Sequence, residues 1–258
     1  MLITSAEVVQ WVGAYLWPFI RISALFLVMP VFGSSFIPVQ VRVLLSVGCT
    51  LMVVPLLPPV PSIDPVSIQG VLVAGHQVLI GIASGLAMQI LIAIFMVGGQ
   101  FIAIQMGLGF STMIDPINGE QSATLGLFFS FIVTLLFIVM NGHLLVLNII
   151  VESFKTLPVA EKGPELSAYW SLIEWAGKIF SGGTLVALPA VAALFLVNVA
   201  MGVMSRAAPQ INLFSIGFSI YIFVGLFAIL FTLSTVLVQF QTYLFEAINV
   251  LKQITKVS

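Results

Sequence analysis

The stretch around which the chain is organised lies near its middle and reads Gln105-Met106-Gly107-Leu108-Gly109-Phe110-Ser111-Thr112-Met113-Ile114-Asp115-Pro116-Ile117-Asn118-Gly119-Glu120-Gln121. Its first half is apolar, but Gly107 and Gly109 each disfavour a helix by about 1 kcal/mol relative to alanine. Asp115-Pro116 disfavours helical geometry at the aspartate, and the Asn-Gly pair that follows is typical of a turn. We therefore expect a non-helical loop with an apolar front and a polar end.

This loop lies between two long apolar runs, residues 66–104 and 125–150. Next to a bilayer, irregular backbone is tolerated only where protein buries it or water reaches it. A movable plug in a pore would need such an apolar loop with two glycines, and an ordinary re-entrant loop would look the same. The residues by themselves leave both interpretations open.

The composition indicates a polytopic helical membrane protein. Hydrophobic residues make up 60% of the 258 positions and charged residues only 7%, whereas a soluble domain carries roughly 25% charge. The net charge of -1 gives no reason to expect nucleic acid as a partner. Cys49 is the only cysteine, which excludes an intramolecular disulfide and a cysteine metal cluster. The first apolar run lacks the basic leader of a cleavable signal peptide, so we expect it to be retained.

The hydrophobic runs predict an all-α membrane protein with about six long, partly kinked helices arranged as hairpins. The runs cover residues 11–29, 41–57, 66–104, 125–150, 179–204 and 213–240. Asn141-Gly142-His143 interrupts the fourth run. The hydrophilic stretch 152–178 is expected to hold a short interfacial helix around Trp170 and Trp175.

The run at residues 66–104 is too long for one straight span. A continuous helix of that length would extend about 58 Å, whereas the hydrocarbon core is about 30 Å thick. Either two helices form a hairpin here, or one long helix kinks, most readily at Gly98-Gly99. Gly81 and Gly85 lie four residues apart and present a small-residue face that permits close helix packing.

Arg21 lies inside the first apolar run. A cation at the centre of a lone span costs about 2.5–3.5 kcal/mol on insertion scales. The side chain must therefore reach an interface, contact a partner or line a polar path, and the sequence leaves these three roles open.

No arrangement typical of catalysis or metal binding appears in the sequence. His76 and His143 lie far apart and have no carboxylate at metal-ligand spacing. There is no phosphate-binding loop, and no pair of related halves with matched broken helices, as in many secondary transporters. We predict no catalytic residue, no cofactor and no metal. Apolar helices rich in small and aromatic residues instead favour packing within a membrane complex.

The central loop resembles that of the FliR family of flagellar biosynthetic proteins, to which the SctT proteins of virulence type III secretion are related. Gln105-Met106-Gly107 leads to Phe110 and then to Asp115-Pro116. Further matching features, in chain order, are Met29-Pro30-Val31-Phe32-Gly33, then Pro38, Val41 and Arg42, a proline-rich connector, Asn141-Gly142-His143, and Arg206-Ala207-Ala208-Pro209-Gln210 followed by Asn212. Each is weak alone, but together they cover essentially the whole chain.

The resemblance implies a structural and gating component of the type III protein export gate. Such a protein assembles with FliP and FliQ, associates with FlhB, contacts membrane lipids and passes unfolded export substrates. It resides in the bacterial inner membrane at the flagellar basal body. Residues 1–185 would be FliP-like and residues 186–258 a FliQ-like helical hairpin. Arg21, Arg42 and Arg206 would be candidates for contacts between subunits.

In the FliR family, the loop that corresponds to residues 105–121 of this chain projects into the central channel and helps to close it. The implied plug side chains are Met106, Leu108, Phe110, Met113 and Ile114. Gly107 and Gly109 would be hinges, and Asp115 and Pro116 would anchor the return of the loop. The alternative function is a stand-alone secondary transporter or channel for a small solute.

Overall fold

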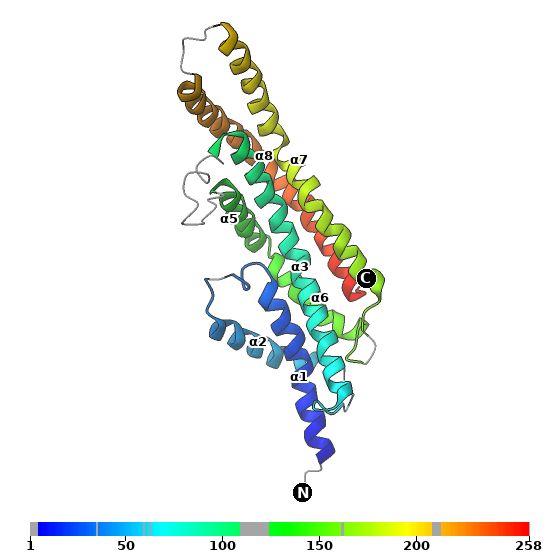
Figure 1. Cartoon of the computed structure of the whole chain (residues 1–258). Helices are drawn as coiled ribbons and strands as arrows, with labels where there is room; N and C mark the ends of the chain where they lie inside the picture. Colours follow the sequence, from blue (N-terminus) through cyan, green and yellow to red (C-terminus); the bar gives the residue numbers. More distant parts are fainter. Residues whose placement is uncertain are drawn as a thin grey trace. The chain divides into compact units, whose positions relative to one another are not determined.

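The computed structural model describes residues 5–34, 36–58, 60–61, 63–108, 124–160, 163–207 and 213–257. The regular structure in these ranges is helical (Figure 1). The elements are α1 (Ser5–Val28), α2 (Val39–Val53), the 3-10 turn η1 (Val54–Leu56), α3 (Ile68–Gln105), α5 (Thr124–Val139), α6 (Gly142–Thr156), α7 (Leu166–Ala207) and α8 (Leu213–Thr255).

The prediction of an all-α membrane protein with about six apolar helices is confirmed. Within the described ranges, 5 helices are long and apolar enough to cross a membrane, or up to 6 if the bent pair α5–α6 counts as one span. That pair bends by 62°. The bend lies at the expected interruption, where Asn141 adopts a left-handed backbone with φ of 55°.

Helix α3 is one continuous helix of 38 residues, so the hairpin alternative for this run was wrong. Gly98 and Gly99 do not end it; they provide close approaches to other helices. A Cβ atom added at Gly98 would lie 3.0 Å from Val186 Cγ1 on α7, and one at Gly99 would lie 2.6 Å from the Leu125 carbonyl oxygen on α5.

The last two helices are longer than the sequence predicted. Helix α7 has 42 residues and α8 has 43. The interfacial helix expected around Trp170 and Trp175 is the first part of α7, which continues through Pro189. A proline can be accommodated there because neighbouring groups in a packed apolar helix can satisfy the freed backbone carbonyl.

The chain divides into two compact units. Unit 1 comprises Met1–Ile90, Phe137–Ala176 and Leu244–Ser258, and unit 2 comprises Leu91–Leu136 and Gly177–Tyr243. This division by contacts differs from the division at residues 185 and 186 inferred from likeness to FliP and FliQ. The division into a FliP-like part and a FliQ-like part rests on resemblance to other proteins and not on contacts within this chain, so it stays a prediction.

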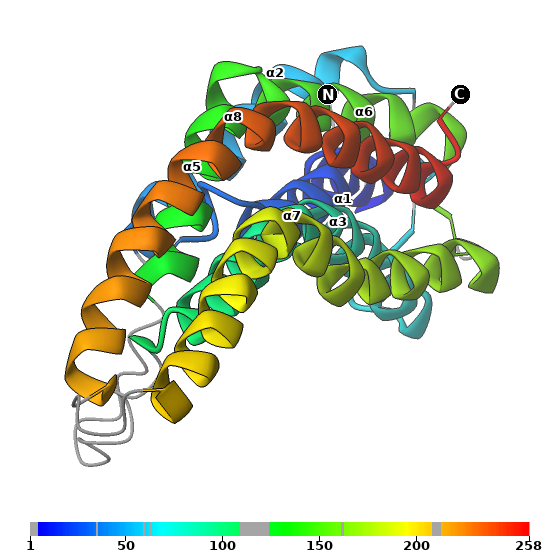
Figure 2. The same ribbon diagram turned by 90° about the horizontal axis from the view of Figure 1, so that it is seen from above.

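In unit 1, α1 and the first part of α3 lie side by side (Figure 2). The expected small-residue face makes this contact, because a Cβ atom added at Gly85 would lie 3.0 Å from Val28 Cβ and one at Gly81 would collide with the Arg21 carbonyl. Leu25, on α1, is completely buried there. The prediction that Gly81 and Gly85 permit close packing is confirmed.

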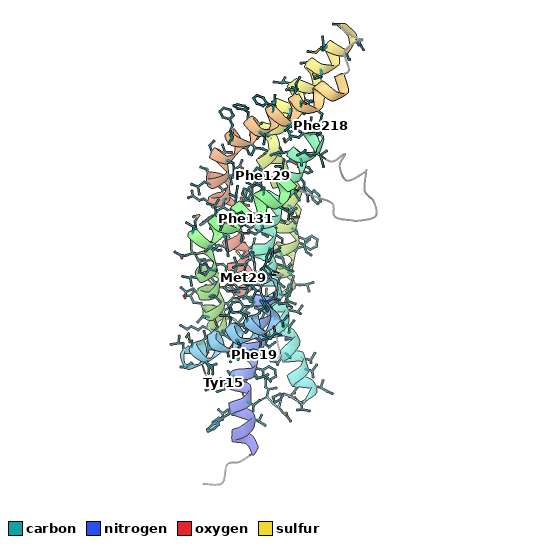
Figure 3. All side chains as sticks on the ribbon, turned by 90° about the vertical axis from the view of Figure 1, so that its left-hand side faces the viewer. Tyr15, Phe19, Met29, Phe129, Phe131 and Phe218 are labelled. Carbon is teal, nitrogen blue, oxygen red and sulfur yellow. The ribbon has the colours of Figure 1, made fainter. Side chains whose placement is uncertain are left out.

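Helix α2 crosses α1 and has an unusual distribution of side chains (Figure 3). Its buried residues are Ser46 and Thr50, whose hydroxyls donate to helix carbonyls four residues earlier, at 2.9 and 2.7 Å. Apart from Gln40, its exposed side chains are apolar: Val39, Val41, Val43, Leu44, Leu45, Val47, Leu51 and Met52. Lipid or another protein must therefore cover this helix.

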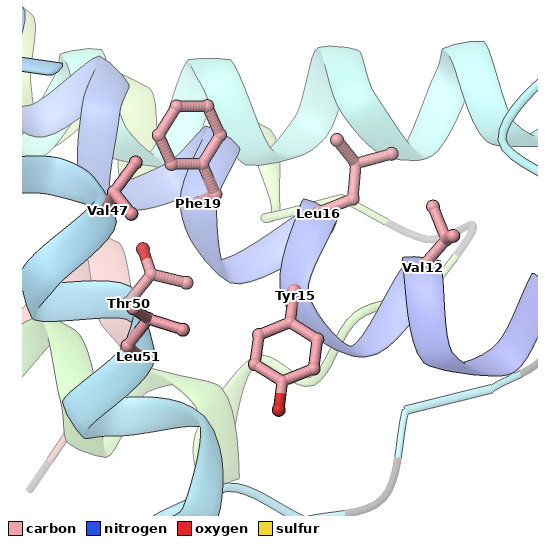
Figure 4. A pocket seen from close by; sticks show the side chains of 7 residues that line it. All are labelled: Val12, Tyr15, Leu16, Phe19, Val47, Thr50 and Leu51. Carbon is pink, nitrogen blue, oxygen red and sulfur yellow. The ribbon is translucent and has the colours of Figure 1, made fainter. Parts of the chain in front are cut away.

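An apolar groove of about 330 Å³ lies between α1 and α2 (Figure 4). Its lining residues are Val12, Tyr15, Leu16, Phe19, Val47, Thr50 and Leu51. Thr50 Oγ1 is already bonded within its own helix, so the groove offers mainly van der Waals contact.

In unit 2, Phe95 on α3 is completely buried. Its ring centroid lies 6.1 Å from that of Phe240 and 5.9 Å from that of Tyr243, both on α8. Gly182 on α7 lies against Ile94 and Tyr243. The core of unit 2 therefore joins the second part of α3 to α7 and α8, and it supports the end of α3, where the central loop begins.

Candidate functional site

The described part of the central loop is its beginning. The Met106 N–H donates to the Ile102 carbonyl at 2.9 Å, and the Gly107 N–H donates to the Ile104 carbonyl at 3.0 Å. Gly107 has φ of 78°, a conformation that glycine adopts without a steric penalty. The chain therefore leaves α3 through a glycine turn of the kind that commonly ends helices, at one of the two glycines that the sequence expected to disfavour a helix.

Met106 is 1% exposed and packs inside unit 2. A Cβ atom added at Gly225 on α8 would lie 2.5 Å from both Met106 Cγ and Cε and 2.6 Å from Sδ. The resemblance implies that Met106 is a plug side chain together with its apolar neighbours, and this role stays a prediction. In the structure the side chain is buried, because the missing side chain of Gly225 leaves space for it.

Leu108 is half-buried. The other loop residues to which the resemblance gives a role lie outside the described residues: Gly109, Phe110, Met113, Ile114, Asp115 and Pro116. Their roles stay predictions from sequence.

A second apolar groove lies beside the end of α3, between α3 and α7, and has a volume of about 280 Å³. Its lining residues are Phe101, Ile104, Gln105, Thr184, Ala187, Leu188 and Val191. The Thr184 hydroxyl donates to the Phe180 carbonyl at 2.8 Å, so it is satisfied within α7. Unit 2 therefore presents an apolar surface next to the residue from which the loop departs.

Arg21 is completely buried in unit 1. Its Nε donates to Gln77 Oε1 at 2.8 Å, its Nη1 to Ser153 Oγ at 2.8 Å and its Nη2 to the Leu157 carbonyl at 2.9 Å. Its Cζ also lies 4.0 Å from the centroid of the Phe154 ring, a cation–π distance. These neutral oxygens and the ring solvate the guanidinium.

The expected contact of Arg21 with a neighbouring subunit does not fit this position. With no exposed surface, the side chain is out of reach of another chain, and its donors are used within unit 1. The position of Arg21 is set by hydrogen bonds to Gln77 and Ser153, which are far from it in the sequence. Neither residue was singled out from the sequence, because a glutamine and a serine in apolar runs give no signal of a shared partner.

Arg42 and Arg206 lie in different surroundings. Arg42 is half-buried, its Nη2 donates to the Ser34 carbonyl at 3.1 Å, and its Nε has no hydrogen-bond partner among the described residues. Arg206 is exposed in the last turn of α7. Arg206 therefore keeps donors that could reach another molecule, whereas the unpartnered Nε of Arg42 is buried.

No group of three or more His, Cys, Asp or Glu side chains that could hold a metal ion occurs among the described residues. Unit 2 contains the buried Met106 at the start of the loop, and unit 1 contains the buried Arg21. The chemistry of these residues is that of packing.

The family described as bacterial export proteins, family 1, matches residues 12–247. Flagellar biosynthetic protein FliR of Pectobacterium carotovorum subsp. carotovorum is 37% identical over 222 residues, covering 86% of this chain and 85% of that protein. The chain belongs to the FliR family of bacterial export proteins. The resemblance seen in the sequence is thereby confirmed.

Two other members of the FliR family extend the match along the chain. FliR of Escherichia coli (strain K12) is 32% identical over 253 residues, covering 98% of this chain and 96% of that protein. FliR of Bacillus subtilis (strain 168) is 30% identical over 240 residues, covering 90% of each. Membership assigns the chain, as a helical membrane protein, to the flagellar export apparatus, and the FliR family is not known as one of enzymes.

Proposed function

We propose that the chain is a structural and gating component of the flagellar type III export gate. With FliP and FliQ it forms the channel through which unfolded flagellar proteins leave the cytoplasm, and FlhB associates with this assembly. It performs no chemical turnover of its own. The observation that carries the proposal is the amount of apolar helix surface that the chain leaves uncovered.

This uncovered surface is too extensive for lipid alone. In their most apolar windows, α7 and α8 are each only 28% buried, and the window in α2 with η1 is 11% buried. The apolar run of α7, residues 179–204, extends about 39 Å, which is longer than the hydrocarbon core of about 30 Å. Part of the apolar length of α7 is therefore left for protein to cover. Exposed apolar faces of this extent mark sites of association.

The central loop supplies the seal in this proposal. Leu108, Phe110, Met113 and Ile114 form an apolar constriction that excludes water and ions by dewetting. Methionine and phenylalanine side chains can move aside for an unfolded polypeptide of any sequence. The glycine turn at Gly107 supports this role, because it directs the chain out of α3 at a fixed point.

The remaining loop and arginine roles follow from the same proposal. Gly109 is a second hinge, and Asp115-Pro116 anchors the return of the loop. Arg42 and Arg206 contact neighbouring subunits, which is supported for Arg206 by its exposure in the last turn of α7. The assembly lies in the bacterial inner membrane at the base of the flagellum.

The proposal is tested by deleting residues 107–114 in a chain that is co-expressed and purified with FliP and FliQ. We expect the assembled complex to conduct KCl current across a planar bilayer where the wild-type complex stays closed. An assembled deletion complex that stays closed would show that the loop is not the seal. Recovery of the chain alone as a well-behaved small oligomer that transports a solute would favour the transporter alternative.

A further inference from the structure

The turn between α1 and α2 has a strained backbone at Val31. Pro30 ends α1, because a proline disfavours helical geometry at the residue before it. Val31 then has φ of 76°, in the left-handed region that β-branched residues rarely enter. Such strain persists only where the surrounding structure holds the residue in place, and it is typical of positions with a functional role.

Two contacts hold Val31 in this conformation. The Gly33 N–H donates to the Met29 carbonyl at 2.8 Å and closes a turn around Val31. The Phe32 ring stacks on the ring of the buried Phe26 of α1, with 4.7 Å between the centroids. Position 33 has no room for a side chain, because a Cβ atom there would lie 2.9 Å from the Met29 carbonyl oxygen. We call this hydrogen bond and this ring stack the latch.

Arg42 ties the residues just before α2 to that helix. Its Nη2 donates to the Ser34 carbonyl at 3.1 Å and lies 3.5 Å from the Ile37 carbonyl oxygen. Both carbonyls precede α2, whereas Arg42 belongs to its first turn. Ser34 and Ile37 are therefore part of the body that turns with α2 when the backbone rotates at Val31.

The contacts that hold α2 on α1 are weak. The apolar window of α2 with η1 is only 11% buried, and the groove of about 330 Å³ lies between the two helices (Figure 4). The hydroxyls of Ser46 and Thr50, the buried residues of α2, are bonded within α2 itself. Moving α2 away from α1 therefore breaks no hydrogen bond of these hydroxyls and removes little apolar contact.

We propose that Val31 is a strained hinge and that α2 is an arm, which the latch holds against α1 and which swings away when the latch opens. Opening lets Val31 return to a backbone conformation that valine adopts without strain, so the strain favours release. The outer face of α2 needs a cover in either position. A partner that covers it better in one position would shift the arm to that position.

The first test measures hydrogen exchange of the Gly33 amide, resolved to single residues, in the full-length chain in lipid nanodiscs. Val31→Asn removes the strain, because asparagine tolerates the left-handed region and lacks the backbone freedom of glycine. We expect exchange at Gly33, corrected for intrinsic rates, to slow about tenfold. Val31→Ile stays β-branched and should exchange as the wild type does. An unchanged rate in Val31→Asn would overturn the inference, because Val31 would then store no strain.

The second test measures the swing as the distance between two spin labels in the same nanodiscs. The labels are attached to cysteines introduced by Leu44→Cys on α2 and Leu79→Cys on α3, both exposed positions, in a chain carrying Cys49→Ala. Phe32→Ala removes the ring stack, and we expect it to enlarge a second distance population several-fold. The matched control is Phe36→Ala, which removes a phenylalanine that is 93% exposed and should leave the wild-type distribution.

The inference is overturned if Phe32→Ala keeps the wild-type distance distribution, because α2 then does not swing when the latch is broken. It is also overturned if Phe36→Ala has as large an effect. Adding Val31→Asn to Phe32→Ala should reduce the second population, and an equal population in both would reject the role of strain. If Phe32→Ala does not fold, Phe32→Leu keeps an apolar side chain without a stacking ring and decides the matter. These outcomes are independent of the KCl currents that test the proposed seal.

Discussion

Arg21 Nη1 donates a 2.8 Å hydrogen bond to Ser153 Oγ, which belongs to a residue 132 positions later in the chain. The same guanidinium binds Gln77 on α3 and the Leu157 carbonyl just after α6. One buried cation therefore joins α1, α3 and α6 in unit 1. The guanidinium can bind acceptors on three segments at once because its N–H donors point in several fixed directions, and we call this arrangement the donor fork.

This fork leads to a prediction about Arg21. Arg21→Met removes the charge but leaves buried acceptors without donors, at about 1–3 kcal/mol for each. Arg21→Lys keeps the buried charge and cannot reach three acceptors from one ammonium group. We expect the thermal unfolding midpoint of the co-purified complex to fall in the order wild type, Arg21→Met, Arg21→Lys. Arg206→Lys is the exposed control, and a lysine variant as stable as wild type would contradict the role of the fork.

The α1–α3 contact predicts opposite effects for two glycines on the same helix. An added Cβ atom at Gly81 would collide with the α1 backbone, whereas one at Gly75 meets nothing within 4 Å. Overfilling a packed contact costs about 1–3 kcal/mol, which exceeds the roughly 1 kcal/mol gained by replacing a helical glycine with alanine. Gly81→Ala should therefore lower the unfolding midpoint and Gly75→Ala should raise it. Equal shifts in one direction would reject close packing at Gly81.

The C-terminal end of α8 is tied to the segment before α7 by an exposed ion pair. Lys256 Nζ lies 2.6 Å from Glu165 Oε1, and the hydrogen bond and the charge of Lys256 hold the pKa of the Glu165 carboxyl below its ordinary range. A carboxyl whose pKa is lower in the folded state than in the unfolded state stabilises the folded state at pH values above its unfolded-state pKa. This stabilisation is lost as the pH falls through the folded-state pKa. Because both groups are exposed, the effect is small.

We therefore expect hydrogen exchange of a peptide spanning residues 251–257, corrected for intrinsic rates, to be unchanged from pH 7 to pH 5. It should accelerate only below about pH 4, the ordinary range of a glutamate. Glu165→Gln should show modest acceleration already at pH 7. Glu174→Gln, which changes another glutamate near the start of α7, serves as the control. Identical exchange in both variants would mean that the pair does not hold the C-terminal end.

The sealing role of the loop predicts a contact with cargo at Phe110. In a chain carrying Cys49→Ala, a cysteine introduced by Phe110→Cys should crosslink to an export substrate stalled in the gate, because the constriction closes around the polypeptide. A cysteine at Leu196, on an exposed face of α7, provides the comparison and should not crosslink to cargo. Labelling of position 110 from lipid only would count against the proposal.

Much of the fold follows from local sequence chemistry. The absence of charge between Asp64 and Asp115 predicts an apolar run too long for one straight span, and the structure makes it one helix of 38 residues, where the sequence left a hairpin equally open. Gly107 predicts the end of that helix, and the structure shows its positive φ there. Asn141-Gly142 predicts the break between α5 and α6. These features depend on propensity and backbone sterics within a few residues, so the sequence is sufficient to locate them.

Other features depend on residues that are distant in the chain. The sequence offers Arg21 three possible roles, and only packing with Gln77 and Ser153 selects the interior. It offers Gly98-Gly99 as the place where a single long helix would kink, and only the structure shows that these glycines lie against α7 and α5. The resemblance gives Met106 a role in the plug, and only the structure shows that this side chain lies buried against Gly225 on α8. The glycine at position 225 is visible in the sequence, but the sequence does not show that Met106 is the residue that packs against it.

The sequence by itself determined the helical membrane class, the family, the position of the central loop and the glycine turn that begins it. Each of these is recorded in composition, in short motifs or in backbone preferences. The tertiary structure alone decided which side chains are buried and against what. It placed Arg21 among neutral hydrogen-bond acceptors and Met106 against Gly225. The physical reason is that burial is a property of two surfaces brought together, and the second surface lies far along the chain.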